Sequence, residues 1–171
     1  MFVIKGILIS NTVLELKKGS KELLNATSTS GIDMYSNNTE DYAPAELTFG
    51  ASYDLSVSRN TIANNVNYKA WIDFNIDGDF NDAGEEIMSS GSTAASSVSG
   101  SFTVPTLANS FEGMTRLRVG VSYGAFSNTP CGLNTVGEFE DYAIKLANDN
   151  LPPSITLVGA DTVRVEKAGT K

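Results

Sequence analysis

The chain has 171 residues, enough for one domain of ordinary size with flanking sequence. Hydrophobic residues make up 41% and charged residues only 19%, a balance that is typical of a β-rich extracellular module. The net charge of −8 opposes nucleic-acid binding. The chain has no histidine and one cysteine, so it cannot form an imidazole-activated nucleophile, an internal disulfide or a Cys/His zinc site.

Residues 1–30 are assigned to an N-terminal extension of unclear fold. The start, MFVIKGILIS, is mildly signal-like, but its apolar stretch is short and no small-x-small cleavage site follows. No apolar run in the chain approaches the roughly 20 residues that cross a bilayer. The segment TVLELKKGSKELLN fits a short helix or two strands broken at Gly19, and both interpretations stay open.

Two strands are predicted before the most polar part of the chain. The segment ELTFGASYDLSVS alternates, with Tyr53, Leu55 and Val57 on one side. The segment VNYKAWIDFN alternates as well, and its inward set is Tyr68, Ala70, Ile72 and Phe74.

An acidic loop follows, in the sequence WIDFNIDGDFNDAGEE. Asp73, Asn75 and Asp77 occupy positions 1, 3 and 5 of an EF-hand-type or dockerin-type loop, with Gly78 at position 6 and Asp79 at position 7. Calcium takes about six to eight oxygen ligands, and alternating loop side chains can converge on it where a glycine permits a sharp turn.

The second half of this loop departs from that pattern. Position 12 is Gly84, so the closing carboxylate is Glu85 or a group from elsewhere, with Asp82 nearby. An acidic surface turn held by Asx hydrogen bonds is the plain alternative. The crowded side-chain oxygens repel one another unless a cation lies between them, and this repulsion favours a calcium site over an empty turn. Magnesium fits less well because it demands a strict octahedral arrangement of ligands. Paired catalytic carboxylates, as in a hydrolase, are a weaker interpretation because an exposed loop keeps both groups ionised.

The remaining segments complete an all-β prediction. SSGSTAASSVSG is assigned to a small-residue connector, and SFTVP, TRLRVGVSY and EFEDYAIKL are assigned to strands. In TRLRVGVSY the core-facing set ends at Tyr123, while Arg116 and Arg118 face out. We predict an antiparallel β-sandwich of jelly-roll or immunoglobulin-like type.

Several residues in these strands have competing interpretations. Glu138 and Glu140 share the inward side with Tyr142, so they need a partner, which is Arg116 or Arg118 in a salt bridge, or the cation. Trp71 and Tyr123 are either core residues or a sugar-stacking platform of a carbohydrate-binding module. Cys131 is assigned to a small buried or half-buried thiol.

The order of these motifs resembles a known family. WIDFNIDGDFNDAGEE, GSFTVP, GMTRLRVGVSY, PCG and GEFEDYAIKL resemble the GEVED domain of secreted bacterial multidomain proteins, over about residues 30–147. Gly137 to Tyr142 stand where the naming motif would be, with Phe139 in place of a smaller apolar residue. The expected domain is therefore 31–147, and relatives often carry a second cysteine near its start that this chain lacks.

The resemblance implies a non-catalytic, extracellular adhesion or binding module beside other domains of a larger secreted or surface protein. Its partners would be a glycan or a cell-surface protein. The family's acidic loop maps onto Asp73, Asn75, Asp77, Asp79 and Glu85.

A linker is predicted at 148–154, where a polar Asn/Asp run precedes Pro152-Pro153. Residues 155–171 offer two strand segments, SITLVG and TVRVEK. They resemble the opening strands of bacterial immunoglobulin-like domains, so we expect the chain to stop inside a second domain.

Overall fold

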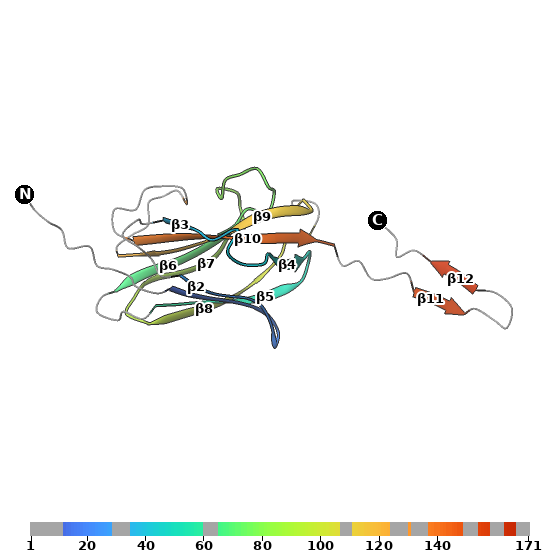
Figure 1. Ribbon diagram of the computed structural model, residues 1–171, viewed down its shortest axis with the longest axis horizontal. Coiled ribbons are helices and arrows are strands. Elements are labelled where there is room, and N and C mark those ends of the chain that lie inside the picture. The colour runs from blue at the N-terminus through green and yellow to red at the C-terminus, as the bar shows by residue number, and fades with distance from the viewer. Residues whose placement is uncertain are drawn as a thin grey trace, which may run out of the picture.

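The computed structural model describes residues 12–28, 35–59, 65–106, 111–123, 130, 137–148, 154–157 and 163–166. These residues form twelve strands and no helix, and so include no helix that could cross a membrane. Most of the strands form two facing layers, one above the other (Figure 1). The predicted all-β sandwich is confirmed.

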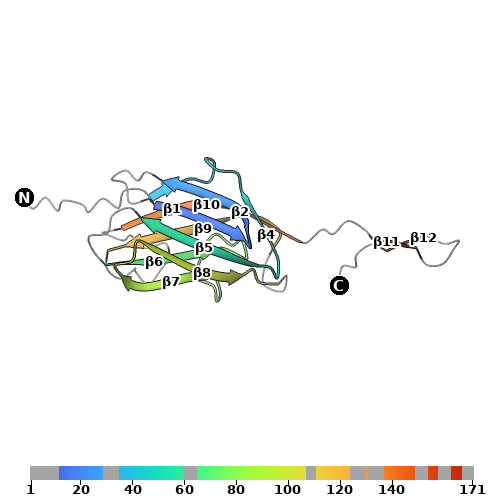
Figure 2. The ribbon, with the colours of Figure 1, turned by 90° about the horizontal axis from the view of Figure 1, so that it is seen from below.

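Sheet A is the four-stranded layer. Its order is β2 (Lys21–Ser28), β1 (Thr12–Lys18), β5 (Ser52–Arg59) and β8 (Ser97–Thr103), and every pair is antiparallel. Figure 2 shows these four strands side by side across the near face of the sandwich.

Sheet B is the six-stranded layer. Its antiparallel part runs β10 (Gly137–Ala147), β9 (Gly113–Ser122), β6 (Val66–Ile72) and β7 (Glu86–Thr93). Two short strands, β3 (Tyr35–Asn37) and β4 (Ala45–Thr48), lie one after the other along the outer side of β10. Both are parallel to β10, so the sandwich is mixed at this edge.

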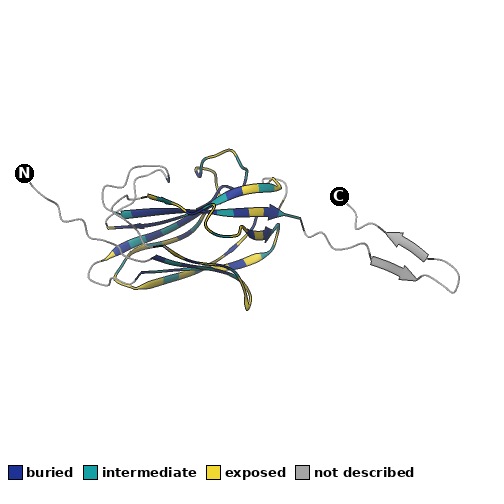
Figure 3. Cartoon of the chain, in the orientation of Figure 1, coloured by how far each residue is buried: buried dark blue, intermediate teal, exposed yellow. Residues whose placement is uncertain are grey.

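The hydrophobic core fills the space between the two sheets. Along the longer strands of the two sheets buried positions alternate with more exposed ones, and the buried positions are dark blue in Figure 3. Sheet A contributes a row of inward side chains, Leu14, Leu16, Leu24, Ala26, Tyr53, Leu55 and Val57. Sheet B contributes Tyr68, Ala70, Ile72, Leu117, Val119, Tyr142, Ile144 and Leu146. The alternation predicted from the sequence is confirmed for each of these sheet B strands, except at Tyr123, which lies beyond the end of β9.

Residues 12–28 do not form a separate extension. They form β1 and β2, which are connected at Gly19 (φ 58°) and pair with each other, and β1 also pairs with β5. The two-strand interpretation is therefore confirmed, and the sandwich begins before residue 31. The strand β1 belongs to the sandwich because its side chains Leu14 and Leu16 are fully buried in the core.

The predicted small-residue connector is wrong over most of its length. Residues 89–93 and 97–100 lie within β7 and β8, which are edge strands of the two sheets. Edge strands tolerate serine and glycine because only one side of their backbone needs pairing. At the C-terminus, β11 (Ser154–Leu157) pairs antiparallel with β12 (Val163–Glu166), as the two strand segments predicted. Membership of an immunoglobulin-like domain stays a prediction.

Candidate metal centre

The acidic loop connects β6 to β7, and its two ends are fixed to the sheet. Ile72 N donates to Glu85 O at 3.0 Å, which closes the base of the loop. Asp73 is held on the neighbouring strand β9, because Asp73 N donates to Arg116 O at 3.3 Å and Thr115 Oγ1 donates to Asp73 O at 2.6 Å. The loop therefore leaves the sheet from a rigid base.

Two buried carboxylates shape the loop from inside. Asp73 is 3% exposed; its Oδ1 accepts from Asp77 N at 3.2 Å and its Oδ2 accepts from Gly78 N at 3.1 Å. Glu85 is 2% exposed; its Oε1 accepts from Phe74 N at 2.9 Å and its Oε2 accepts from Asp82 N at 3.3 Å. Both oxygens of each carboxylate therefore accept a main-chain hydrogen bond. Each oxygen still has a lone pair with which it could bind a further ligand.

Burial changes the chemistry of Glu85. Removal from water raises the pKa of its carboxyl group, and the negative charges of Asp73 and Asp82 add to that rise. The backbone N–H groups of Phe74 and Asp82 lower the pKa and so oppose it.

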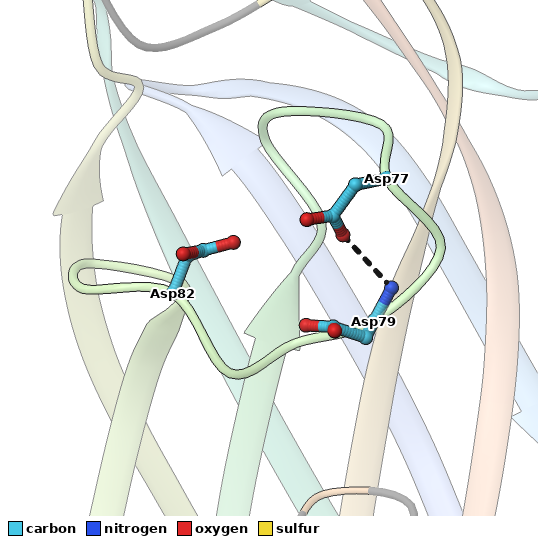
Figure 4. A group of neighbouring side chains, drawn as sticks. All are labelled: Asp77, Asp79 and Asp82. Carbon is cyan, nitrogen blue, oxygen red and sulfur yellow. Dashed lines mark hydrogen bonds between the residues drawn. The ribbon is translucent and has the colours of Figure 1, made fainter.

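Three carboxylates converge on the outer side of the loop. One oxygen from each of Asp77, Asp79 and Asp82 can be chosen so that all three lie within 4.8 Å of one another, and the three side chains point toward a common centre (Figure 4). We call these residues the acidic cluster. Asp79 N donates to Asp77 Oδ1 at 3.1 Å, and this bond is the main reason that the pKa of the Asp77 carboxyl lies below its ordinary value.

Asn75 lies among these carboxylates. Its Nδ2 donates to Asp77 Oδ2 at 3.0 Å and to Asp82 Oδ2 at 2.7 Å, while its Oδ1 accepts from Asp77 N at 3.2 Å. The amide group therefore offsets part of the negative charge. In this orientation Asn75 offers the carboxylates donor hydrogens and not a further oxygen.

The backbone of the loop is tightly curled. Gly78 has φ 96° and Ile76 has φ 58°, both in the left-handed region. Glycine adopts that region freely, but for a β-branched residue it costs about 1–2 kcal/mol. Ile76 is held there by the surrounding hydrogen bonds, so the curl is imposed by the whole loop and not by local preference.

The far side of the loop is packed onto the outer face of sheet B. Phe80 is 3% exposed and forms a small apolar cluster with Trp71 and Phe139, while the Arg118 guanidinium lies 5.0 Å from the Phe80 ring centre. We call Trp71, Phe80, Phe139 and Arg118 the Phe80 cluster. Arg116 adds a polar contact, because its Nη2 donates to Gly78 O at 3.1 Å.

Arg118 of the Phe80 cluster also forms a buried ion pair. Arg118 Nε and Nη2 donate to Asp141 Oδ1 and Oδ2, each at 2.7 Å, and the Asp141 carboxylate is fully buried. Tyr35 Oη donates to Asp141 Oδ2 at 2.9 Å, and Arg116 lies 3.5 Å from the same carboxylate. Strands β3, β9 and β10 are thereby tied together beneath the loop.

The structure separates the predicted site residues into groups. Asp77 and Asp79 lie in the acidic cluster with Asp82, which the sequence placed second to Glu85, whereas Asp73 and Glu85 lie inside the loop as backbone anchors. Among the residues that the structure describes, this is the group of acidic side chains close enough to share an ion.

Glu138 and Glu140 lie elsewhere. Both are buried on the inward face of β10, where Glu140 Oε2 accepts from Tyr142 Oη at 2.7 Å. The carboxylate partner that the structure gives both Arg116 and Arg118 is Asp141, which the sequence did not single out. The cause is alternation, since Asp141 faces outward like the two arginines.

The two aromatic candidates for a sugar platform differ in exposure. Trp71 is 4% exposed and packed in the Phe80 cluster, so it offers no open ring face. Tyr123 is 44% exposed and lies one residue beyond the end of β9, not in the core as its alternation predicted. Cys131 lies outside the described residues.

Sequence reasoning missed the Phe80 cluster. One signal was available: Phe80 is a large apolar residue in a run of Asp, Asn and Gly, and such a residue in a polar loop indicates that the loop folds back onto protein.

Comparison with known families identifies the domain. The family model of the GEVED domain matches residues 67–145, which run from the start of β6 nearly to the end of β10. A search of curated proteins finds no match for the chain. The chain therefore carries a GEVED domain, with the acidic loop and the Phe80 cluster inside the matched region.

Proposed function

We propose that this chain is a calcium-stabilised, non-catalytic accessory or adhesion module of a larger secreted or surface protein. The observation that carries the proposal is the convergence of Asp77, Asp79 and Asp82 within 4.8 Å on a loop whose backbone is already curled around two buried carboxylates.

Electrostatics supports a cation at this place. Three carboxylates at such separations repel one another. In this structure the Asn75 amide group and the main-chain N–H groups of Asp79 and Asn81 offset part of that repulsion. A divalent ion would remove the rest. The donors are all oxygens, the ligands that calcium prefers, and water can complete the shell because Asp77 and Asp82 are exposed.

The same geometry argues against catalysis by these groups. A general acid needs a carboxyl group that holds its proton near neutral pH, but the pKa of Asp77 is lowered. Glu85 has the raised pKa, yet it is 2% exposed and both of its oxygens accept backbone hydrogen bonds. Asp77 is exposed but has the wrong pKa for a general acid, and Glu85 has the raised pKa but no access to a substrate.

A bound ion would act on the fold through the loop. It would join the first half of the loop to the second, and Phe80 lies between them, so the packing of Phe80 on Arg118 would become firmer. A ligand that binds only the folded state at a hundredfold excess over its Kd adds about 2.7 kcal/mol to stability. Calcium sites of extracellular modules have Kd values of about 10⁻⁴–10⁻³ M, which suits an environment rich in calcium.

The adhesive role and its partners rest on the family resemblance and on composition. The proposed partner is a glycan or a cell-surface protein, and adjacent domains of the parent chain would position the module. Tyr123 is an exposed aromatic residue near the end of β9 that a glycan could contact. A glycan array of the calcium-loaded protein would test this part.

Thermal unfolding tests the metal site. We expect about 10 mM calcium to raise the melting temperature by several degrees relative to EDTA, because the ion binds only the folded loop. Asp77→Ala should lose most of this rise. Glu22→Ala, which removes an exposed carboxylate on β2, should keep it. Equal melting temperatures in calcium and EDTA for the unmodified chain would contradict the proposal.

A further inference from the structure

One edge of sheet A is formed by β8, which also contacts β7 of the facing sheet. Strand β8 pairs with β5 and with no other strand in the part of the chain that the structure describes, and it lies along one margin of the sandwich (Figure 2). Its register with β5 runs without interruption from Thr103 to Ser97. A regular edge strand presents a row of main-chain N–H and C=O groups with which another strand can pair.

The hydrogen bonds at the two ends of β8 establish which groups face the open side. Arg59 N donates to Ser96 O at 2.8 Å, and Val104 N donates to Ala51 O at 3.0 Å. Even-numbered residues therefore direct their main chain toward β5. Because this direction alternates along a strand, the N–H and C=O groups of four residues point away from β5. These residues are Ser97, Ser99, Ser101 and Thr103.

The other edge strands carry features that hinder pairing. On β2, the Tyr42 hydroxyl accepts from Thr27 N at 3.2 Å and donates to Thr27 O at 3.1 Å, so a side chain occupies that edge. Strand β7 has two register irregularities against β6, and β3 and β4 have only three and four residues. Strand β8 has seven residues, with no charge, no proline and no irregularity against β5.

The sequence of β8 is nearly palindromic. In SVSGSFT, Ser97 and Thr103 are both hydroxyl residues, Val98 and Phe102 are both apolar, and Ser99 and Ser101 flank Gly100. A two-fold interface must be complementary to itself. We propose that β8 pairs antiparallel with β8 of a second copy of this chain, centred on Gly100, so that two A sheets become one continuous sheet.

The chemistry of this register is favourable at each position. Ser99 would face Ser101 of the second copy as a hydrogen-bonded pair, and Gly100 would face its own copy where the Cα atoms approach to about 4.5 Å. Ser52 and Thr103 (2.8 Å) and Ser56 and Ser99 (3.1 Å) already show that outward hydroxyls pair across these strands. The net charge of −8 does not oppose the contact locally, because β8 carries no charge.

Sedimentation equilibrium of the full chain tests the proposal. Ser99→Pro removes an N–H that faces away from β5, so it deletes two inter-copy hydrogen bonds per dimer and none within the sheet. We expect the dimer dissociation constant to rise at least tenfold, on the order expected for two lost bonds. Ser99→Ala keeps the N–H group and should dimerise like the unmodified chain.

A second variant keeps the test decisive if the proline variant does not fold. Ser99→Lys combined with Ser101→Lys brings lysines opposite one another across the two-fold axis, and it should also abolish the dimer. A chain that stays monomeric up to about 1 mM, where even weak specific contacts saturate, would overturn the proposal. So would a dimer that both folded variants leave unchanged.

Discussion

Single residues in the acidic loop have two different tasks. Asp73 and Glu85 are buried and accept backbone hydrogen bonds, whereas Asp77, Asp79 and Asp82 reach the surface of the loop. The sequence predicted a set of ligands from spacing alone. Spacing shows which side chains can converge, but not which of them the backbone has already engaged, and this explains why Asp82 was ranked below Glu85.

The raised pKa of Glu85 predicts a specific pH dependence. Between its ordinary value of 4.5 and its raised value, the folded state binds more protons than the unfolded state. The contribution of Glu85 to stability is therefore fully present below 4.5 and is lost as the pH rises through the raised pKa. In EDTA, the free energy of unfolding of the unmodified chain should fall relative to that of Glu85→Gln as pH rises. The fall should be about 1.4 kcal/mol for each pH unit by which folding raises the pKa of Glu85.

Asp77 should show the opposite pH dependence, and urea denaturation across a pH series can measure both effects. Its pKa is lowered, so its contribution is present above the ordinary value of 3.8 and is lost as pH falls through the lowered value. The difference between the unmodified chain and Asp77→Asn should therefore shrink toward acid. A Glu85→Gln difference that grows with pH would show that burial does not control this carboxyl group.

The backbone of Gly78 predicts a further single-residue effect. A Cβ at this position would meet no heavy atom within 4 Å, but φ is 96°, so Gly78→Ala should cost about 1 kcal/mol from conformation alone. Gly100→Ala in β8 is a matched control, since its Cβ would lie 3.5 Å from Met88 Cγ at an ordinary backbone conformation. Chemical denaturation of both variants at low protein concentration would distinguish them, and equal stabilities would contradict the assignment of strain to Gly78.

At the scale of elements, the outer face of sheet B explains where the loop is held. The Phe80 cluster rests on the ion pair between β9 and β10, in which Arg118 is 11% exposed and Asp141 is fully buried. Removal of one partner from a buried pair leaves an uncompensated charge. The loop, β9, β10 and β3 should therefore respond together to a change at this pair.

Asp141→Ala should lower the free energy of unfolding by about 3 kcal/mol or more, because it leaves the Arg118 guanidinium without its bidentate partner. Glu46→Ala breaks an exposed salt bridge to Lys145, which lies on β10 like Asp141, and should cause no measurable change in the free energy of unfolding. Urea denaturation of the two variants makes the comparison. Similar losses in both would mean that burial of the Asp141 pair adds nothing.

The strands could be read from the sequence where one face is buried and the other is not. Alternation in TRLRVGVSY and EFEDYAIKL predicted β9 and β10 correctly, because a one-residue shift would expose the whole apolar set. β7 was missed, and β8 was predicted only from Ser101 onward, because the serine and glycine residues before it give no such alternation. The pairing of β1 with β5 joins segments about forty residues apart, and local pattern cannot report contacts at that separation.

In the whole molecule, the acidic loop is a structural element of the sandwich. The loop and the sheet contact each other through Phe80, Arg116 and Thr115, so an ion held by the loop would stabilise the fold as a unit. The carboxylates would then be ligands and not catalysts, in keeping with an accessory module.

The most direct test is isothermal titration of calcium into the EDTA-treated and dialysed chain. We expect one saturable site per chain, with a Kd of about 10⁻⁴–10⁻³ M, that is lost in Asp79→Asn and in Asp82→Asn and retained in Glu22→Gln. No saturable heat at calcium concentrations of about 10 mM, or the same binding in all three variants, would contradict it.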